Sequence, residues 1–598
     1  MSAHDHRDYH RPAPGQRPGL GQGLGQGLGQ DLGSTVGQSL SPWLRLISSG
    51  IWWIEHAFER ARADGRPEED TRVRIFLITC VFSLVFVCLA IGAAHAALFA
   101  DRGGAGASSN PNALSRADLV DRNGALLASN ITHYGLYIDP AEVWDRQLAF
   151  EQIHRALPAI PASRLRKVLF GDRRLIVQPG LTPRERATIH ALALGGVSFE
   201  PEDRRVYPLN NSATYVVGTA DTGGQGLSGA ELAFNDEIRA AGQRGEDFPL
   251  SIDLRVQGVL ENELAAAAMA NGSKGAVGIV ADTQTGEILG MASWPLGTLN
   301  RAVGSVYEMG SVFKTFTIAA AVDAGRADMN SMIDASSAYM IGTRKITDFH
   351  ATNRVLSLEE VYLHSSNIGS SRLAVGMGGT MMRDYLDRFG FLAPAPIELK
   401  ESARPIRPRD WSDSTLASMS FGYGISITPA QMAAAMNALG NGGRYLPLSL
   451  RRGGAPNRGE GRRVVSEQTS MTMLELMRRN VVAGSGNFAE APGLRVGGKT
   501  GSANKLVNGR YDPSHAVGTF AAIFPADGPI GTHRYSILVL MDEPQSYPKT
   551  GGYVAAPAVG RIADRIAGFL GVQRRADPYR TAMGDKIPRF QDVEGDGR

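Results

Sequence analysis

The chain has 598 residues, of which 43% are hydrophobic and 20% are charged, and its formal net charge is +3 at pH 7. The composition is typical of a globular protein, and the length predicts about four domains. The nearly balanced charge argues against a nucleic-acid partner, because no basic stripe with interleaved aromatic residues accompanies it. The only two cysteines, Cys80 and Cys88, fall in one apolar stretch, which excludes a disulfide framework in the long C-terminal part.

Residues 1–74 are predicted to form an N-terminal tail. The first 40 residues are rich in glycine, proline and glutamine, so they cannot bury a core and should be disordered. Residues 42–63 mix apolar and charged side chains in a pattern typical of an amphipathic helix. Two interpretations of this helix stay open: it lies on the inner membrane surface, or it docks on a partner.

Residues 75–97 are apolar and carry no formal charge. At about 1.5 Å per residue, a helix of this length crosses a hydrocarbon layer of roughly 30 Å. The stretch begins far from the N-terminus, which favours a retained transmembrane helix over a signal peptide. Five arginines precede it between residues 60 and 74, whereas few basic residues follow, so the N-terminus is predicted to be cytoplasmic and the rest periplasmic.

Residues 98–246 are predicted to form a periplasmic pedestal without catalytic function. A linker rich in glycine, serine and asparagine at 103–112 leaves the membrane, and short strands and helices follow it. Residues 121–124 are typical of a turn and 134–138 of a strand. Nothing in this region pairs a nucleophile with a base.

Residues 247–572 form the predicted catalytic domain, followed by a charged, loose C-terminal tail at 573–598. A helix opens the domain, a hairpin with a glycine-containing turn follows, and strands return late in the chain. This order predicts an α+β fold in which one antiparallel sheet carries helices on its faces. The elements expected are helices at 255–269 and 559–570 and strands at 275–282, 287–293, 517–524 and 535–541.

Ser311 lies at the start of an apolar, alanine-rich run that ends at Gly325. The pattern predicts a helix that begins near Ser311 and places Lys314 one turn further on, as its neighbour. A serine needs a base to become a nucleophile, and lysine is such a base only if burial or a nearby cation lowers its pKa from about 10.4. Taken alone, Ser-x-x-Lys is a weak signal, and Ser502 and Lys505 have the same spacing.

Two later motifs strengthen this signal. Ser365-Ser366-Asn367 follows about fifty residues later, and Lys499-Thr500-Gly501-Ser502 stands near the end of the chain. Serine, lysine, Ser-x-Asn and Lys-Thr-Gly in this order form the set of the penicillin-binding proteins and the active-site serine β-lactamases, which the chain therefore resembles.

Each of these motifs occurs more than once. Residues 108–110 and 485–487 also fit Ser-x-Asn, but the former precede the nucleophile in the linker and the latter lie in a glycine-flanked loop. Residues 549–551 are a second Lys-Thr-Gly, which follows Pro548 in a loop-like stretch. The motifs at 365–367 and 499–502 are chosen because they occur in the expected order and Lys499 follows a plausible strand.

Further stretches resemble the class B penicillin-binding proteins. Within that class, the residues of the two pedestal motifs are most similar to those of the septal, cell-division branch of the FtsI type. Two departures stand out: Met309 replaces a usual proline, which predicts a less rigid approach to the nucleophile, and Ser502 replaces a common threonine but keeps the hydroxyl. The stretches that carry the resemblance are 300–301, 307–308, 421–424, 428–431 and 497–501 around the site, and 116–124 and 229–231 in the pedestal.

The resemblance implies peptidoglycan cross-linking through a serine acyl-enzyme. Ser311 attacks the carbonyl between two terminal D-alanines and releases D-alanine, while Lys314 takes the hydroxyl proton. Ser365 relays that proton to the leaving amine, and Asn367 hydrogen-bonds the substrate amide. Lys499 is a second cation that keeps Lys314 neutral and attracts the terminal carboxylate.

The same resemblance assigns substrate binding to Thr500, Gly501 and Ser502. The hydroxyls of Thr500 and Ser502 bind the carboxylate, and the backbone N–H groups of Ser311 and Ser502 form the oxyanion hole. A β-lactam mimics the donor and leaves the serine acylated. No metal or cofactor is required.

The sequence leaves three other functions open: an elongation-branch class B transpeptidase, a D,D-carboxypeptidase, and a β-lactam sensor or scaffold without turnover. The pedestal favours class B, and residues 99–246 are too few for the glycosyltransferase domain of a bifunctional class A enzyme. By resemblance the partners are peptidoglycan stem peptides, β-lactams, the inner membrane, a glycosyltransferase of the shape-and-division family and other division proteins. The acceptor amino acid is not predicted.

Overall fold

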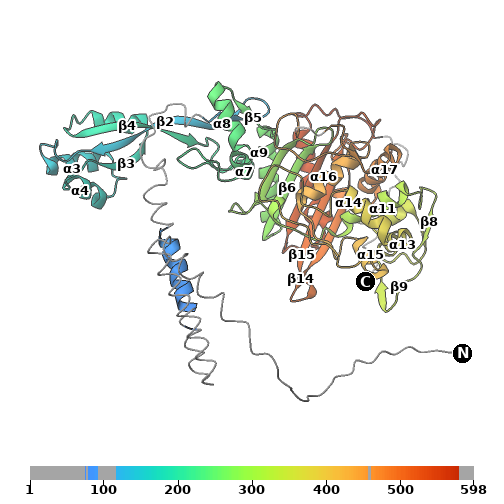
Figure 1. The fold of residues 1–598 in the computed structure, drawn as a ribbon. Coiled ribbons are helices and arrows are strands. Elements are labelled where there is room, and N and C mark those ends of the chain that lie inside the picture. Colours follow the sequence, from blue (N-terminus) through green and yellow to red (C-terminus); the bar gives the residue numbers. More distant parts are fainter. Residues whose placement is uncertain (1–74, 76–77, 92–115, 456–458, 578, 580–598) are drawn as a thin grey trace, which may run out of the picture. The chain divides into compact units, whose positions relative to one another are not determined.

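The computed structural model of the chain describes residues 75, 78–91, 116–455, 459–577 and 579 (Figure 1). They belong to two compact units, one within residues 1–107 and the other within residues 108–598. The predicted N-terminal tail, with its amphipathic helix at 42–63, and the linker at 103–112 lie outside the described residues.

A single helix over residues 78–91 is described in the first unit. Its side chains are exposed and mostly apolar, Phe82 at 70% and Phe86 at 76%, and Cys80 and Cys88 are free thiols on it. Among the described residues, no helix is both long enough and apolar enough to cross a membrane. The span predicted at 75–97 extends past this helix into residues that are not described.

The pedestal contains a mixed five-stranded sheet in which β3, β2, β1 and β5 are neighbours in that order and β4 also pairs with β2. Most of its pairs are antiparallel, whereas β1 and β5 run parallel. A separate small core of α3, α4 and α5 packs against β2 and β3. The elements are β1 Leu119–Val120, β2 Leu126–Ile138, α3 Arg146–Ala156, α4 Ala162–Leu169, β3 Leu175–Leu181, α5 Pro183–His190, β4 Val197–Val206, α6 Thr214–Val217, α7 Gly229–Ala233, α8 Asn235–Arg244 and β5 Phe248–Pro249.

The two pedestal motifs meet in a buried charge network. Arg116 donates from Nε (3.0 Å) and Nη2 (2.6 Å) to Glu231 Oε2, although 115 residues separate them. Arg205 Nε donates to the other oxygen of Glu231 at 2.6 Å, and the Glu231 side chain is fully buried. Both motifs therefore serve the internal packing of the pedestal.

The second domain is built on the predicted antiparallel sheet, with the strand order β14-β15-β16-β6-β7. Figure 1 shows β14 and β15 beside each other and β6 further across the same sheet. Its strands are β6 Gly275–Asp282, β7 Ile288–Trp294, β14 Gly497–Val507, β15 Arg510–Phe524 and β16 Tyr535–Asp542, and the short strands are β8 Met332–Asp334, β9 Tyr339–Ile341, β10 Arg344–Ile346, β11 Val355–Ser357, β12 Arg444–Tyr445 and β13 Arg462–Arg463.

Helices cover both faces of this sheet. Side chains of β16 alternate between two cores: Val539 packs with α9 and α19, and Leu540 packs with α11 and α16. Its helices are α9 Leu254–Ala270, α10 Arg301–Gly304, η1 Gly310–Phe313, α11 Lys314–Asp323, α12 Leu358–Leu363, α13 Asn367–Met377, α14 Gly379–Arg388, α15 Asp413–Met419, α16 Pro429–Gly440, α17 Glu467–Ala483, η2 Asn487–Ala489, α18 Gly551–Val554 and α19 Ala556–Ile566.

The structure contains the predicted opening helix, hairpin, late strands and closing helix, and most of them begin and end within a few residues of the predicted bounds. The exception is β15, which begins earlier in the chain than the predicted strand at 517–524. The boundary at 246/247 stays a prediction, because buried residues on both sides of it, such as Phe248 and Ala241, share one continuous core.

The beginning of the predicted loose tail differs from the expectation. Asp577 is only 8% exposed and accepts a hydrogen bond from Nε of the fully buried Arg478 at 3.0 Å. The same guanidinium donates to Glu490 at 2.7 Å. Residues 573–577 are therefore held against α17, because a buried arginine needs their carboxylate.

The Glu231 network gives a stability prediction. Glu231→Gln leaves two buried guanidinium groups without their charged partner, so the free energy of unfolding should fall by about 3–5 kcal/mol. Glu246→Gln is the matched control, since its ion pair with Arg244 is 57% exposed on both sides and contributes at most about 1 kcal/mol. Urea denaturation of the full chain measures both, and equal losses in the two variants would contradict the role assigned to Glu231.

Candidate active site

Ser311 lies in the 3₁₀ turn η1, directly before α11, which begins at Lys314. The Nζ atom of Lys314 is 3.0 Å from Ser311 Oγ. The predicted proximity of the two side chains is confirmed, although the first turn is tighter than the α-helix expected. Gly325 follows the end of α11 with a φ of +63°, as the sequence pattern indicates.

The amine of Lys314 is surrounded by oxygen atoms. It lies 2.5 Å from the Ser365 carbonyl oxygen and 2.7 Å from Asn367 Oδ1, and neither of these oxygens can donate a proton. A neutral amine has two N–H groups for these acceptors and one lone pair, which can then accept the hydroxyl proton of Ser311. These contacts fit a neutral lysine that acts as a base, but an ammonium could donate to the same oxygens, so the burial of the group decides its form.

Burial explains how this lysine becomes neutral. Lys314 is fully buried, and burial, followed by the positive charge of Lys499, holds its pKa well below the ordinary lysine value. The carboxylate of Asp348 acts weakly in the opposite direction. Burial also lowers the pKa of Lys499 to about 7, so near neutral pH this group exchanges readily between its charged and neutral forms.

Ser365 and Asn367 stand at the N-terminal end of α13. Ser365 has a φ of +55°, which is uncommon for a residue with a side chain, and this conformation accompanies the contact of its carbonyl with Lys314. Asp348 holds the turn: it accepts hydrogen bonds from Ser366 Oγ at 2.7 Å and from the Ile368 N–H at 2.9 Å. Sequence reasoning missed Asp348, because nothing local distinguishes it from other loop aspartates.

Lys499 lies on β14 and completes the chain of contacts. Its Nζ is 3.1 Å from Ser365 Oγ, which is in turn 3.0 Å from Lys314 Nζ. In the register of the sheet it pairs with Ala521, whose side chain belongs to the core under α11. The structure thus brings together Ser311, Lys314 and Lys499 through Ser365, as the sequence predicts.

Glycines permit the close approach of the nucleophile turn to β14. Gly310 has a φ of +54°, and a Cβ atom there would lie 2.3 Å from the Ser502 carbonyl oxygen. A Cβ atom on Gly501 would lie 2.2 Å from the carbonyl oxygen of Met309. Met309, which stands where the family usually has proline, is itself buried. Packing of its side chain in the core therefore holds the turn without the rigid ring of a proline.

The rejected copies of the motifs contact the chosen Lys-Thr-Gly strand. Ser485 Oγ is 2.8 Å from Thr500 Oγ1, and the Gly551 N–H donates to Ser502 Oγ at 3.1 Å. Lys549, in contrast, donates to the carbonyl of Ser514. Ser485 and Gly551 therefore hold the hydroxyls of β14 in place and are not part of the predicted catalytic set. The sequence alone does not reveal this supporting role.

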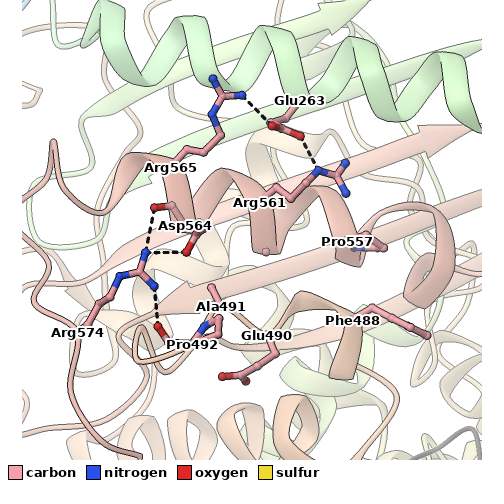
Figure 2. Close-up of a pocket in the computed structure, with 11 residues that line it drawn as sticks. Glu263, Phe488, Glu490, Ala491, Pro492, Pro557, Arg561, Asp564, Arg565 and Arg574 are labelled. Carbon is pink, nitrogen blue, oxygen red and sulfur yellow. Dashed lines mark hydrogen bonds and ion pairs between the residues drawn. The ribbon is translucent and has the colours of Figure 1, made fainter.

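A separate cavity of about 670 Å³ lies by α9 and α19 (Figure 2), and none of the predicted site residues lines it. Glu263 accepts hydrogen bonds from Arg561 at 2.6 Å and Arg565 at 2.8 Å. Arg574 pairs with Asp564 at 2.6 Å. These charged groups of the cavity are therefore paired with one another, and the predicted catalytic residues lie elsewhere.

The arrangement of Ser311 and Lys314 suits an enzyme that forms an acyl-serine, and comparisons with known proteins agree with the fold. Residues 276–564 match the penicillin binding protein transpeptidase domain, and residues 111–241 match the penicillin-binding protein dimerisation domain. The chain belongs to the penicillin-binding protein transpeptidases that carry both domains.

Named relatives narrow this further. The chain is 50% identical to the probable peptidoglycan D,D-transpeptidase FtsI of Caulobacter vibrioides, over 91% of this chain and 97% of that protein. It is 32% identical to the probable peptidoglycan D,D-transpeptidase PenA of Neisseria gonorrhoeae, over 77% and 85% of the two chains. It is 28% identical to the peptidoglycan D,D-transpeptidase FtsI of Escherichia coli, over 79% and 86%.

The lowered pKa of Lys314 predicts the pH dependence of acylation. The rate is lost as pH falls through this lowered pKa, because protonation removes the base. Between pH 8 and pH 10 the second-order acylation constant for a penicillin should therefore not rise tenfold per unit, as an ordinary lysine with a pKa of about 10.4 would require. Stopped-flow acylation of the full chain measures the profile, and the profile of an unperturbed lysine would contradict the role assigned to Lys314.

Asp348→Asn should move the acid limb of this profile to lower pH, since the Asp348 carboxylate raises the pKa of Lys314.

Proposed function

We propose that the chain is a peptidoglycan D,D-transpeptidase that cross-links stem peptides at the division septum through an acyl-enzyme. The observation that carries this proposal is the fully buried amine of Lys314, 3.0 Å from Ser311 Oγ and joined through Ser365 to Lys499. The names of the Caulobacter and Escherichia relatives support the septal branch over the elongation branch. The match to the dimerisation domain and the names of these relatives favour a transpeptidase over a β-lactam sensor or a scaffold without turnover.

In the first half-reaction Ser311 Oγ attacks the carbonyl carbon between the two terminal D-alanines. Its proton passes to Lys314 Nζ, the C–N bond breaks, and the leaving D-alanine takes a proton. Ser365 Oγ lies 3.0 Å from Lys314 Nζ and 3.1 Å from Lys499 Nζ, so it can carry the proton toward the leaving amine. An amine of a neighbouring strand then attacks the ester, forms the cross-link and returns a proton to Ser311.

Substrate binding is proposed for β14 and for Asn367. Ser502 accepts a hydrogen bond from Gly551, so its own proton is free for the substrate carboxylate. Thr500 Oγ1 and the Lys499 amine lie 3.3 Å apart, which gives the carboxylate a cation beside the hydroxyl. The backbone N–H groups of Ser311 and Ser502 form the oxyanion hole, a role supported by the contact of Gly310 with Ser502, and loss of one such donor costs about 3–4 kcal/mol of barrier.

A single transmembrane anchor at 75–97 in the inner membrane is also proposed, with the catalytic domain in the periplasm. Its support is the helix at 78–91, whose exposed side chains are mostly apolar, since such a surface needs an apolar environment. The glycosyltransferase of the shape-and-division family and other division proteins remain the proposed partners, and the pedestal and the anchor are the parts expected to contact them.

Penicillin labelling tests the nucleophile. After treatment with benzylpenicillin, mass spectrometry of the full chain should show one adduct, and peptide mapping should place it on Ser311. Ser311→Ala should abolish the adduct. Ser485→Ala, which removes a nearby hydroxyl, should retain it. Labelling that survives in Ser311→Ala would refute the mechanism.

Cellular localisation tests the septal branch. A fluorescent fusion of the full chain should concentrate at mid-cell in dividing cells, and depletion should give filaments that elongate without dividing. Ser311→Ala should localise like the parent but fail to restore division. Signal confined to the side wall would assign the chain to the elongation branch.

A further inference from the structure

Glu308 is a half-buried carboxylate three residues before Ser311, and the mechanism above does not use it. Its Oε1 atom accepts hydrogen bonds from the Gly424 N–H at 2.6 Å and from the Tyr511 hydroxyl at 3.0 Å. In the described part of the chain no cation forms an ion pair with Glu308, although the charge of Arg344 acts on its neighbour Tyr511, whereas Glu231 and Glu287 are each paired with arginine. Its Oε2 atom makes no hydrogen bond with the described residues.

Leaving a carboxylate partly desolvated without a cation is costly, because burial disfavours its charged form. Burial does raise the pKa of Glu308. The two hydrogen bonds to Oε1 offset part of this cost and fix the orientation of the group, while no described residue bonds the second oxygen, which is open to water or to a ligand. A carboxylate in this state beside a nucleophile is a candidate for contact with a ligand cation.

Aromatic rings surround the same spot. Tyr423 and Tyr511 meet edge to face with their centroids 4.9 Å apart, and Tyr511 is 44% exposed. The Tyr423 hydroxyl accepts a hydrogen bond from the N–H of Asn504, two residues beyond Ser502 on β14. Gly422, next to Tyr423, packs against the backbone of Gly310. These contacts place the rings and Glu308 between the nucleophile turn and the outer half of β14.

We propose that Glu308, Tyr423 and Tyr511 form a subsite for a primary ammonium group of the peptide substrate. A carboxylate oxygen together with aromatic rings is a chemistry that binds organic ammonium ions. The inference rests on the proposed function, since transpeptidation brings an amine of a second strand to the Ser311 ester. An acceptor that binds as its ammonium loses one proton to water before the neutral amine attacks the ester, and its second proton returns to Ser311. An amine carried by the donor strand would present the same chemistry.

A purely structural role explains only half of these observations. If Glu308 merely held the Gly424 N–H and the Tyr511 hydroxyl, its Oε1 atom would suffice, and a glutamine could replace it. Glu308→Gln is therefore the informative variant, because the amide oxygen can keep both hydrogen bonds while the charge is lost. Glu246→Gln serves as the matched surface control.

The experiment uses the full chain in detergent with two sets of substrates. In the first, a D-alanyl depsipeptide donor with its amines acetylated forms the acyl-enzyme, and a stem-peptide fragment with one free amine is the acceptor. The partition of the acyl-enzyme between hydrolysis and aminolysis gives the acceptor KM. In the second, donors with free and acetylated amines are compared in acylation without acceptor.

If the ammonium belongs to the acceptor, Glu308→Gln should raise the acceptor KM about tenfold, leave hydrolysis unchanged and remove the salt dependence of aminolysis. If the ammonium belongs to the donor, Glu308→Gln should lower the acylation rate constant about tenfold for the free-amine donor and leave it unchanged for the acetylated donor. Equal effects of the variant on free-amine and acetylated substrates would overturn the subsite. Failure of the wild-type chain to form an acyl-enzyme from the depsipeptide would overturn the proposed function, and the subsite with it.

Discussion

The removal of the Lys314 amine from water is the physical constraint on which the site depends. A charged ammonium in this position would be expensive, and the group responds by giving up its proton. Other features of the site follow from it: the Ser365 carbonyl and the Asn367 amide oxygen accept from the two N–H groups, and the hydroxyls of Ser311 and Ser365, each 3.0 Å from Nζ, lie within reach of its lone pair. Lys499 adds a second amine that disfavours any return of the charge.

The chain treats buried charge in three ways. In the pedestal, Glu231 is buried and kept charged by Arg116 and Arg205. In the catalytic domain, Lys314 is buried and made neutral. At the rim of the site, Glu308 is half buried and left without a cation of its own among the described residues. The first arrangement stabilises the pedestal, the second produces a general base, and the third is part of the subsite that we propose for an ammonium group.

Sequence reasoning recovers what is encoded locally or by motif order. The helix after Ser311, the β6–β7 hairpin and the late strands have clear periodicity and turn signals, and three motifs in order predict that Ser311, Ser365 and Lys499 meet. The support of these groups could not be predicted in this way. The contacts of Asp348, Ser485, Gly551 and Asp577 join segments distant in sequence, and their residue types are common in loops, so only the folded chain distinguishes them.

A direct titration of Lys314 is the most telling measurement. The chain has only nine lysines, so labelling them with ¹³C at Cε gives few signals, and Lys314→Arg and Lys499→Arg assign the two buried ones. The account predicts that the Lys314 signal titrates well below pH 10 in the free protein, and that Lys499→Arg, which keeps a permanent positive charge nearby, leaves it low. A Lys314 amine that stays protonated to pH 10 or above would contradict the account.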